Sequence, residues 1–145
     1  MKTIRVLVVS IAEVIASACS GFGGEPGCDL CTTSAIVYGS VHGATGAPVS
    51  GASVTADIRI DSCQGMSVGS LGGPSIADAL GVYHLRARSL SAPAAACLLL
   101  TVQPPTGSGL RAIVDTGHVV RLQADWPSGA VLDSVRVDFV IPPAA

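Results

Sequence analysis

The chain has 145 residues, of which 49% are hydrophobic and only 12% are charged. A chain of this length has room for one domain with a core of workable size. Lys2 is the only lysine, and beyond residue 18 six arginines face nine acidic residues, a net charge of about −3. That balance provides no basic patch for nucleic acid or an anionic membrane, so neither is an expected direct partner.

Residues 1–18 have the organisation of a secretory signal peptide. Lys2 and Arg5 make the start positive, and residues 6–15 form a mostly apolar run. This run is well short of the roughly 20 apolar residues that a transmembrane helix needs. We therefore expect residues 1–18 to be removed from the mature protein.

The residues around the expected cleavage point predict a lipid anchor. Small residues, Ala16 and Ala18, precede Cys19, as a signal peptidase requires. A cysteine in this position resembles the bacterial lipobox, in which the thiol receives diacylglycerol. This resemblance implies lipidation of Cys19 and attachment to the membrane of the bacterial cell envelope. The alternative is a secreted or periplasmic protein that is cleaved at the same point.

Residues 19–34 are expected to form a tether between that anchor and the folded domain. They are rich in glycine and include a C-x-x-C motif at Cys28 and Cys31. A flexible coil of about 14 residues spans roughly 20 Å, which is enough to lift a domain clear of lipid headgroups.

The five cysteines suit an oxidising compartment. With Cys19 lipidated, four remain, and four cysteines permit three disulfide connectivities. We favour a Cys63–Cys97 bond, with Cys28 and Cys31 paired locally. A redox role for the C-x-x-C motif would need a βαβ unit beside it, and a zinc site would need a second closely spaced pair. We therefore expect structural disulfides.

After the tether, apolar and polar residues alternate, as they do in strands with one buried face. No segment beyond the signal peptide has a convincing helical period. About seven strands are expected, at residues 36–41, 52–60, 83–88, 97–102, 111–114, 120–124 and 134–141. One-sided strands without helices must cover one another. We therefore predict an all-β fold for residues 35–143, a seven-stranded antiparallel Ig-like or prealbumin-like β-sandwich.

Two motifs add a family resemblance over roughly residues 36–141. The first is a strand–turn–strand unit with Gly46 and Pro48 in its turn and Gly51 where the second strand begins. The second reads Ala-Asp-x-x-Gly-x-Tyr from residue 77, where the usual pattern begins with Thr. Together they resemble the carboxypeptidase regulatory-like, or transthyretin-like, β-sandwich domain.

The resemblance implies fold-forming roles for the second motif. Asp78 is expected to cap a turn through backbone N–H groups, Gly81 to adopt a positive φ, and Tyr83 to pack inward. For function, the family implies an accessory or scaffolding module beside peptidases, receptors and surface proteins.

Three patterns point towards chemistry, and we interpret each of them as structural. Residues 65–69 match G-x-S-x-G, but that nucleophile elbow needs a strand before it and a helix after it. Residues 115–117 read Asp-Thr-Gly, as in aspartic proteases; we interpret them as a β-turn between two strands. The spacing of His42, His84 and His118 does not bring them together. We therefore expect no catalytic residue, no metal, no cofactor and no enzyme activity.

The expected function is a non-enzymatic module of the cell envelope, or a secreted one, that has a structural role or contacts a partner protein. The alternative is a carbohydrate-binding domain with a starch-binding-like fold. In that alternative Trp126, in an expected loop, would contact a polysaccharide.

Overall fold

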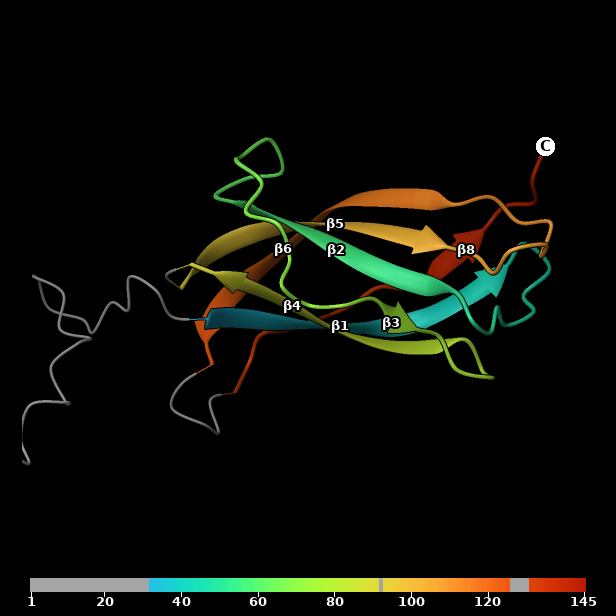
Figure 1. Ribbon diagram of the computed structural model, residues 1–145, viewed down its shortest axis with the longest axis horizontal. Helices are drawn as coiled ribbons and strands as arrows, with labels where there is room; N and C mark the ends of the chain where they lie inside the picture. Colours follow the sequence, from blue (N-terminus) through green and yellow to red (C-terminus); the bar gives the residue numbers. More distant parts are fainter. Residues whose placement is uncertain (1–31, 92, 126–130) are drawn as a thin grey trace, which may run out of the picture.

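The structure is a computed structural model that describes residues 32–91, 93–125 and 131–145 (Figure 1). Within these residues every regular element is a strand, which confirms the all-β prediction. No helix among them is long and apolar enough to cross a membrane. The eight strands are β1 (Thr32–Gly43), β2 (Ser53–Ile60), β3 (Ser75–Ile76), β4 (Val82–Leu90), β5 (Ala94–Gln103), β6 (Ile113–Ala124), β7 (Ser134–Arg136) and β8 (Phe139–Ile141).

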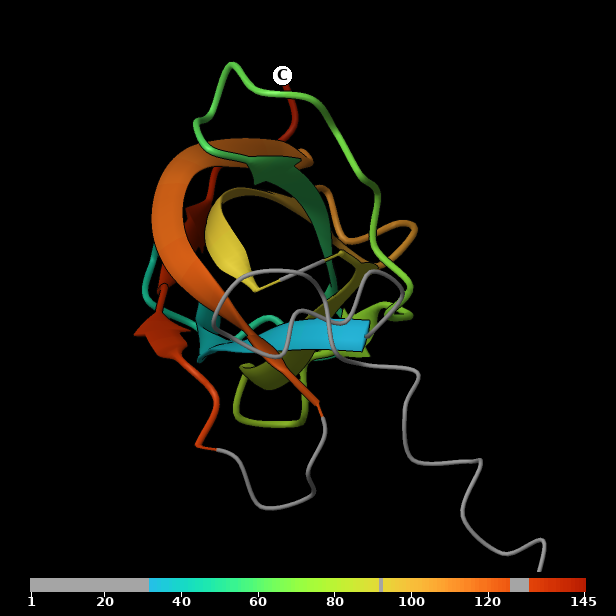
Figure 2. The ribbon, with the colours of Figure 1, turned by 90° about the vertical axis from the view of Figure 1, so that its left-hand side faces the viewer.

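The strands form one curled sheet that folds over into two layers (Figure 2). Its order is β3-β2-β5-β6-β1-β4, and β7 and β8 also pair with β1. Strand β6 joins the layers, because it pairs with β5 over most of its length and with Thr33 and Ser34 of β1 at its end. One layer is therefore β3-β2-β5-β6, and the other is β4-β1 with β7 and β8.

The prediction of seven antiparallel strands is wrong in two respects. The residues that the structure describes form eight strands, and β7 and β8 run parallel to β1. The direction follows from the path of the chain: β6 ends beside Thr33 at the start of β1, so the chain that follows runs along β1 in the same direction. The expected single strand 134–141 is divided because Asp138 binds the backbone N–H of Ser40 at 2.9 Å and its hydroxyl at 2.8 Å.

The prediction of a β-turn at residues 115–117 is also wrong. β6 continues through these residues, and the two strands predicted around them are one. Leu98 pairs with His118 and Leu99 with Thr116, so Gly117 is the extra residue of a β-bulge, with φ 105°. A bulge absorbs one residue and increases the local twist without reversing the chain.

The core lies between the two layers and consists of the apolar positions that alternation predicts. In β4 the buried residues are Tyr83, Leu85, Ala87 and Ser89, and the residues between them are exposed. Fully buried aliphatic side chains come from both layers: Val37, Val41, Val54, Ile58, Leu98, Leu100, Leu122 and Ile141. Each such side chain stabilises the fold by about 1.5–3 kcal/mol relative to exposure.

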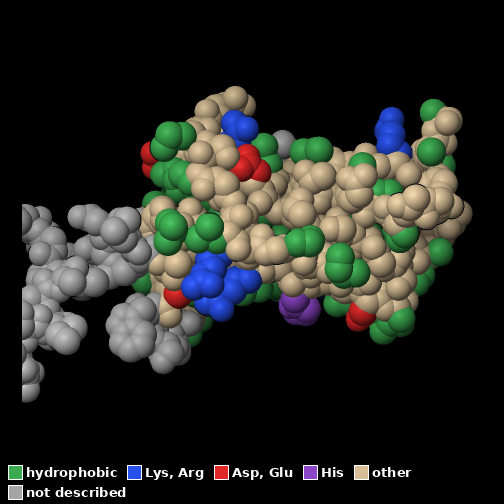
Figure 3. Space-filling model, in the orientation of Figure 1, with side chains coloured by type: hydrophobic (Ala, Val, Ile, Leu, Met, Phe, Trp, Pro, Cys, Tyr) green, Lys and Arg blue, Asp and Glu red, His purple; other side chains and the backbone are tan. Residues whose placement is uncertain are grey.

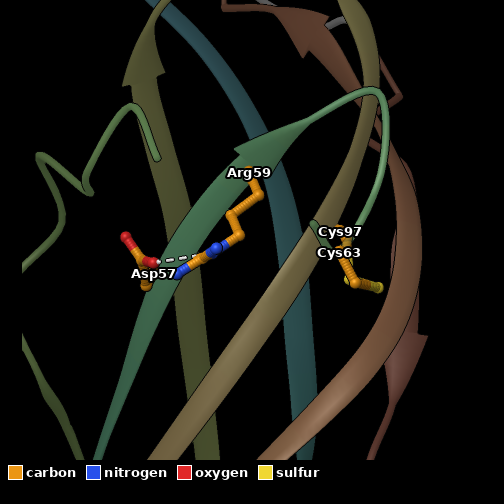
Figure 4. The surroundings of a disulfide bond; sticks show 4 residues. All are labelled: Asp57, Arg59, Cys63 and Cys97. Carbon is orange, nitrogen blue, oxygen red and sulfur yellow. Dashed lines mark ion pairs between the residues drawn. A yellow bond between two sulfur atoms is a disulfide. The ribbon is translucent and has the colours of Figure 1, made fainter. Parts of the chain in front are cut away.

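Residues 61–76, the part of the connection from β2 to β4 that runs up to the end of β3, are here called the strap. Near its start, Cys63 forms a disulfide with Cys97 of β5, with S–S 2.01 Å (Figure 4). The strap then returns along β2, where the N–H of Val68 donates to the carbonyl of Ile58 at 2.9 Å. It therefore lies along the side of the sandwich where β3, beside β2, ends one layer and β4 ends the other.

Candidate functional site

The solvent-facing side of β4, β1 and β7, here called the outer face, gathers aromatic and basic side chains. The pairing register places Tyr38 of β1 directly between His84 of β4 and Arg136 of β7. The rings of Tyr38 and His84 stack with centroids 6.0 Å apart and an interplanar angle of 14°. The side chain of Tyr38 is about one third exposed (36%).

Two arginines of β4 extend the outer face towards the start of β1. Arg86 Nη2 donates to Asp125 Oδ1 at 2.8 Å, and Arg88 Nε donates to Asp125 Oδ2 at 3.0 Å. The same guanidinium groups reach the hydroxyls of Ser34 and Thr32, each at 3.2 Å. Asp125 therefore holds both arginines in place while about half of each side chain stays exposed, 53% and 46%.

Figure 3 shows basic side chains beside a histidine over this part of the molecule. Arg136 is held in the same way, because its Nε donates to Asp138 Oδ2 at 3.0 Å. Three of the six arginines in the described residues thus lie on the outer face. With Asp125 and Asp138 they leave one positive charge in excess, although the chain as a whole is negative.

The two aspartates have lowered pKa values. Burial alone would raise the pKa of Asp125, but hydrogen bonds from Ser34, Arg86 and Thr32 and the charge of Arg86 outweigh it and lower the pKa. For Asp138, hydrogen bonds from Ser40 lower the pKa more than desolvation raises it, and Arg136 adds to this effect. Both carboxylates are therefore charged at neutral pH and keep the arginines oriented.

This composition is typical of protein contacts. Tyrosine and arginine are enriched among the residues that dominate the energy of protein interfaces. An exposed sugar platform needs a free ring face, whereas one face of Tyr38 is turned towards His84. The outer face therefore offers hydrogen-bond donors, a partly exposed tyrosine ring and positive charge.

The turn residues singled out by sequence lie at the far end of the sandwich from Asp125. Asp78 Oδ1 accepts the N–H groups of Leu80 at 2.8 Å and Val82 at 2.9 Å. Gly46, Gly51 and Gly81 have φ values of 83°, 78° and 76°. Pro48 forms a bridge with His42, and Tyr83 is buried.

The Asp-Thr-Gly and G-x-S-x-G motifs lie outside the outer face. His118 Nε2 and Asp115 Oδ2 are 2.9 Å apart, and their cross-strand partners in β5 are core residues. This pair therefore lies on the core-facing side of β6 but is only partly covered, because the side chains of His118 and Asp115 are 23% and 42% exposed. Ser67 donates from its hydroxyl to Asp57 Oδ1 at 2.5 Å, in the strap rather than in a strand–helix turn. Asp57 also pairs with Arg59 (Figure 4).

Other predicted residues fall beyond what the structure describes. Cys19, Cys28, Cys31 and Trp126 lie outside the described residues. Asp125, which precedes Trp126, is described, and its backbone N–H donates to the carbonyl of Thr32 at 2.9 Å. Within the described part of the chain no three His, Cys, Asp or Glu side chains are grouped to hold a metal ion.

The outer face was not among the residues selected from sequence. Alternation placed His84, Arg86 and Arg88 on the polar side of a strand, but their neighbours Tyr38 and Arg136 are distant in sequence. Only the register of β1 with β4 and β7 brings them together. The available signal was the density of arginine and histidine in one strand of a chain that is otherwise poor in charge.

Comparisons with known proteins add two solved structures. No protein-family model and no curated protein matches the chain significantly. Hydroxyquinol 1,2-dioxygenase from Pseudomonas putida DLL-E4 is 17% identical, with a TM-score of 0.46 over 76% of this chain and 56% of that one. Chlorocatechol 1,2-dioxygenase from Pseudomonas putida is 15% identical, with a TM-score of 0.45 over 77% and 61%. The chain thus spans less than two thirds of either structure.

These two structures correct one expectation. Both are dioxygenases, and therefore enzymes, which contradicts the prediction that the chain is not an enzyme. The correction extends no further, because likeness at this level transfers neither an active site nor a reaction.

Proposed function

We propose that this protein is a recognition module of the bacterial cell envelope that binds a partner protein through the outer face. The observation that carries the proposal is the exposed cluster of Tyr38, stacked on His84, and three arginines that Asp125 and Asp138 orient through ion pairs. Such preorganised polar and aromatic groups lose little side-chain entropy on binding. They also steer an acidic partner towards the face.

The proposed location follows from the sequence. Residues 1–18 would direct export, lipid at Cys19 would attach the protein to a membrane, and the tether would precede β1. The alternative is that the protein carries no lipid and is secreted or periplasmic. The strand–turn motifs around Gly46 and Asp78 support a relationship to the carboxypeptidase regulatory-like domain, which we propose as the family.

A binding assay on envelope proteins tests the function. The mature chain, with Cys19→Ser for solubility, is immobilised, and retained proteins are compared between wild type and the double variant Tyr38→Ala/Arg86→Gln. The matched control is Val119→Ala/Arg111→Gln, on exposed positions away from the outer face. We expect a specific protein to bind wild type and the control and to be lost with the outer-face variant. Equal retention by all three chains would refute the role of the outer face.

Binding of a polysaccharide is the second candidate. It is favoured by Trp126, which follows Asp125 at the edge of the outer face. Because Trp126 is the only tryptophan, its fluorescence reports this region directly. A saturable fluorescence change with a polysaccharide, lost in Tyr38→Ala, would support sugar binding in place of protein binding.

A further inference from the structure

The free edge of β4 is covered by the strap at only a few points. β4 ends the sheet order, and on its open side the carbonyl of Arg88 accepts the N–H of Leu71 at 2.7 Å. Four residues away the N–H of His84 donates to the side-chain oxygen of Ser75 at 3.1 Å. The strap thus meets the edge with one backbone bond and one side-chain bond, where a paired strand would form a continuous ladder.

Close approach of the strap to β4 depends on a glycine. A Cβ on Gly72 would lie 2.4 Å from the carbonyl oxygen of Arg86. Adding a side chain there must displace either the strap or β4, because the opposing atom belongs to the backbone. Gly72 therefore marks the point where the strap occupies the place of a neighbouring strand.

Few apolar contacts hold the strap. The side chains of Met66 and Leu71 are 75% and 58% exposed, and Val68 is the strap residue that packs against the core. The covalent attachment is the Cys63–Cys97 disulfide. Losing this bond removes the covalent constraint on the strap. The strap then keeps its hydrogen bonds to β2, including the pairing of β3 with β2, but only the two hydrogen bonds described above join it to β4.

We propose that the edge of β4 is a strand-addition site for an extended acidic segment of the partner protein, and that the strap covers this site. The inference rests on the proposed protein-binding function and specifies the partner. In strand addition, main-chain hydrogen bonds supply affinity and alternate side chains supply specificity. Displacing the strap exposes the N–H and carbonyl groups of His84, Arg86 and Arg88 to such a segment.

The side chains of β4 define the sequence pattern of this segment. His84, Arg86 and Arg88 point to the outer face, while Leu85 and Ala87 point to the core. Residues of an added strand lie directly opposite these positions, about 4.5–5.5 Å away between Cβ atoms. The matching segment therefore alternates acidic residues outward with apolar residues inward.

The same register disfavours a second copy of this chain as the occupant. Antiparallel pairing of β4 with its own copy, centred on Arg86, would place the two Arg86 side chains directly opposite each other. Like charges in directly opposed positions destabilise a strand pair. Charge complementarity thus favours an acidic segment over self-association.

Peptide binding to the mature chain tests the site. The probe is a fluorescein-labelled nine-residue peptide that alternates glutamate with valine; the control has the same composition in one valine block and one glutamate block. Anisotropy is measured with wild type, with Cys63→Ser/Cys97→Ser, and with Gly72→Val, in which the disulfide remains. We expect both strap-released variants to bind the alternating peptide at least tenfold more tightly than wild type does, and at least tenfold more tightly than they bind the block peptide.

Adding Arg86→Gln/Arg88→Gln to the Gly72→Val variant should weaken binding about tenfold and reduce its salt dependence. Strand addition would be overturned if the block peptide bound as tightly as the alternating glutamate–valine peptide. It would also be overturned if an alternating lysine–valine peptide bound as tightly as the glutamate–valine peptide. Equal binding by wild type and both released variants would overturn the covering role of the strap. If no variant bound the alternating peptide, but Tyr38→Ala/Arg86→Gln still lost the partner protein in the envelope-protein assay, only the strand-addition inference would be rejected and the proposed function would stand. Circular dichroism shows which variants are folded. If the double cysteine variant is unfolded, the test rests on Gly72→Val, which keeps the disulfide.

Discussion

The hydroxyl of Tyr83 donates to the backbone carbonyl of Val137 at 2.8 Å and so links β4 to the segment between β7 and β8. The ring packs near Phe139, with centroids 5.8 Å apart. Burial, with the charges of Asp138 and Asp115, raises the pKa of Tyr83, so the hydroxyl remains a donor throughout the usual pH range. This one residue therefore contributes both to the core and to the attachment of the chain that follows β6.

Replacing Tyr83 with Phe isolates the hydrogen bond. The ring stays, but the carbonyl of Val137 loses its donor, which should lower the free energy of unfolding by about 1–2 kcal/mol. Tyr38→Phe is the matched control, because that residue lies on the outer face; its effect should stay within about 0.5 kcal/mol. Urea denaturation measures both. Equal losses in the two variants would contradict the assigned role of the buried bond.

The Cys63–Cys97 disulfide should be a major source of stability. Its sequence separation of 34 corresponds to about 4 kcal/mol on the chain-entropy model. We expect Cys63→Ser/Cys97→Ser to melt well below oxidised wild type and to be insensitive to reductant, while wild type shifts down when reduced. A melting temperature that is the same with and without reductant in wild type would rule this out.

Substituting Gly81 and Gly107 distinguishes the cost of backbone strain from the cost of steric overlap. Both have positive φ, 76° and 79°, but a Cβ on Gly81 would lie 2.5 Å from the carbonyl oxygen of Val41, and one on Gly107 would meet nothing within 4 Å. Gly107→Ala should cost about 1–2 kcal/mol from the φ alone. Gly81→Ala should cost a further 1–3 kcal/mol or so from overpacking. Thermal unfolding of both variants would show similar losses if the close approach to Val41 were absent.

Asp125 predicts a specific acid sensitivity. Its lowered pKa means that its contribution to stability is fully present above the unfolded pKa, about 4, and is lost as pH falls through the lower folded pKa. Asp125→Asn should remove part of the stability at pH 7 and flatten the decline between about pH 5 and 2. Denaturant unfolding at several pH values measures this. If the free energy of unfolding fell with pH in the same way in wild type and variant, Arg86 and Arg88 would not be stabilising the charged form of Asp125.

Strand periodicity was sufficient to predict the fold class and the buried face of most strands. Ala52, Val54 and Ile58 are buried as alternation requires, because a strand turns successive side chains to opposite faces. The pattern could not distinguish a turn from a bulge at Gly117, since glycine with positive φ serves both. Nor could it show that β7 and β8 run parallel to β1, which depends on where β6 ends.

The outer face was beyond sequence reasoning for a similar reason. Polar positions of a strand are visible in sequence, but their neighbours are determined by pairing between distant segments. Tyr38, Arg86 and Arg136 come from three strands and meet only through register. The net negative charge of the whole chain also gave no sign of the local excess of arginine. On the outer face three arginines lie with only two aspartates, Asp125 and Asp138, which orient them.

Site-specific photo-cross-linking in the producing cell tests recognition by the outer face most directly. A photoreactive phenylalanine analogue replaces Tyr38 in one strain and Val119, exposed on β6 in the other layer, in a second. We predict a discrete protein adduct from position 38 that is absent from position 119 and that disappears when Arg86→Gln/Arg88→Gln is added. An adduct from position 119 alone, or the same adducts from both positions, would contradict the assignment.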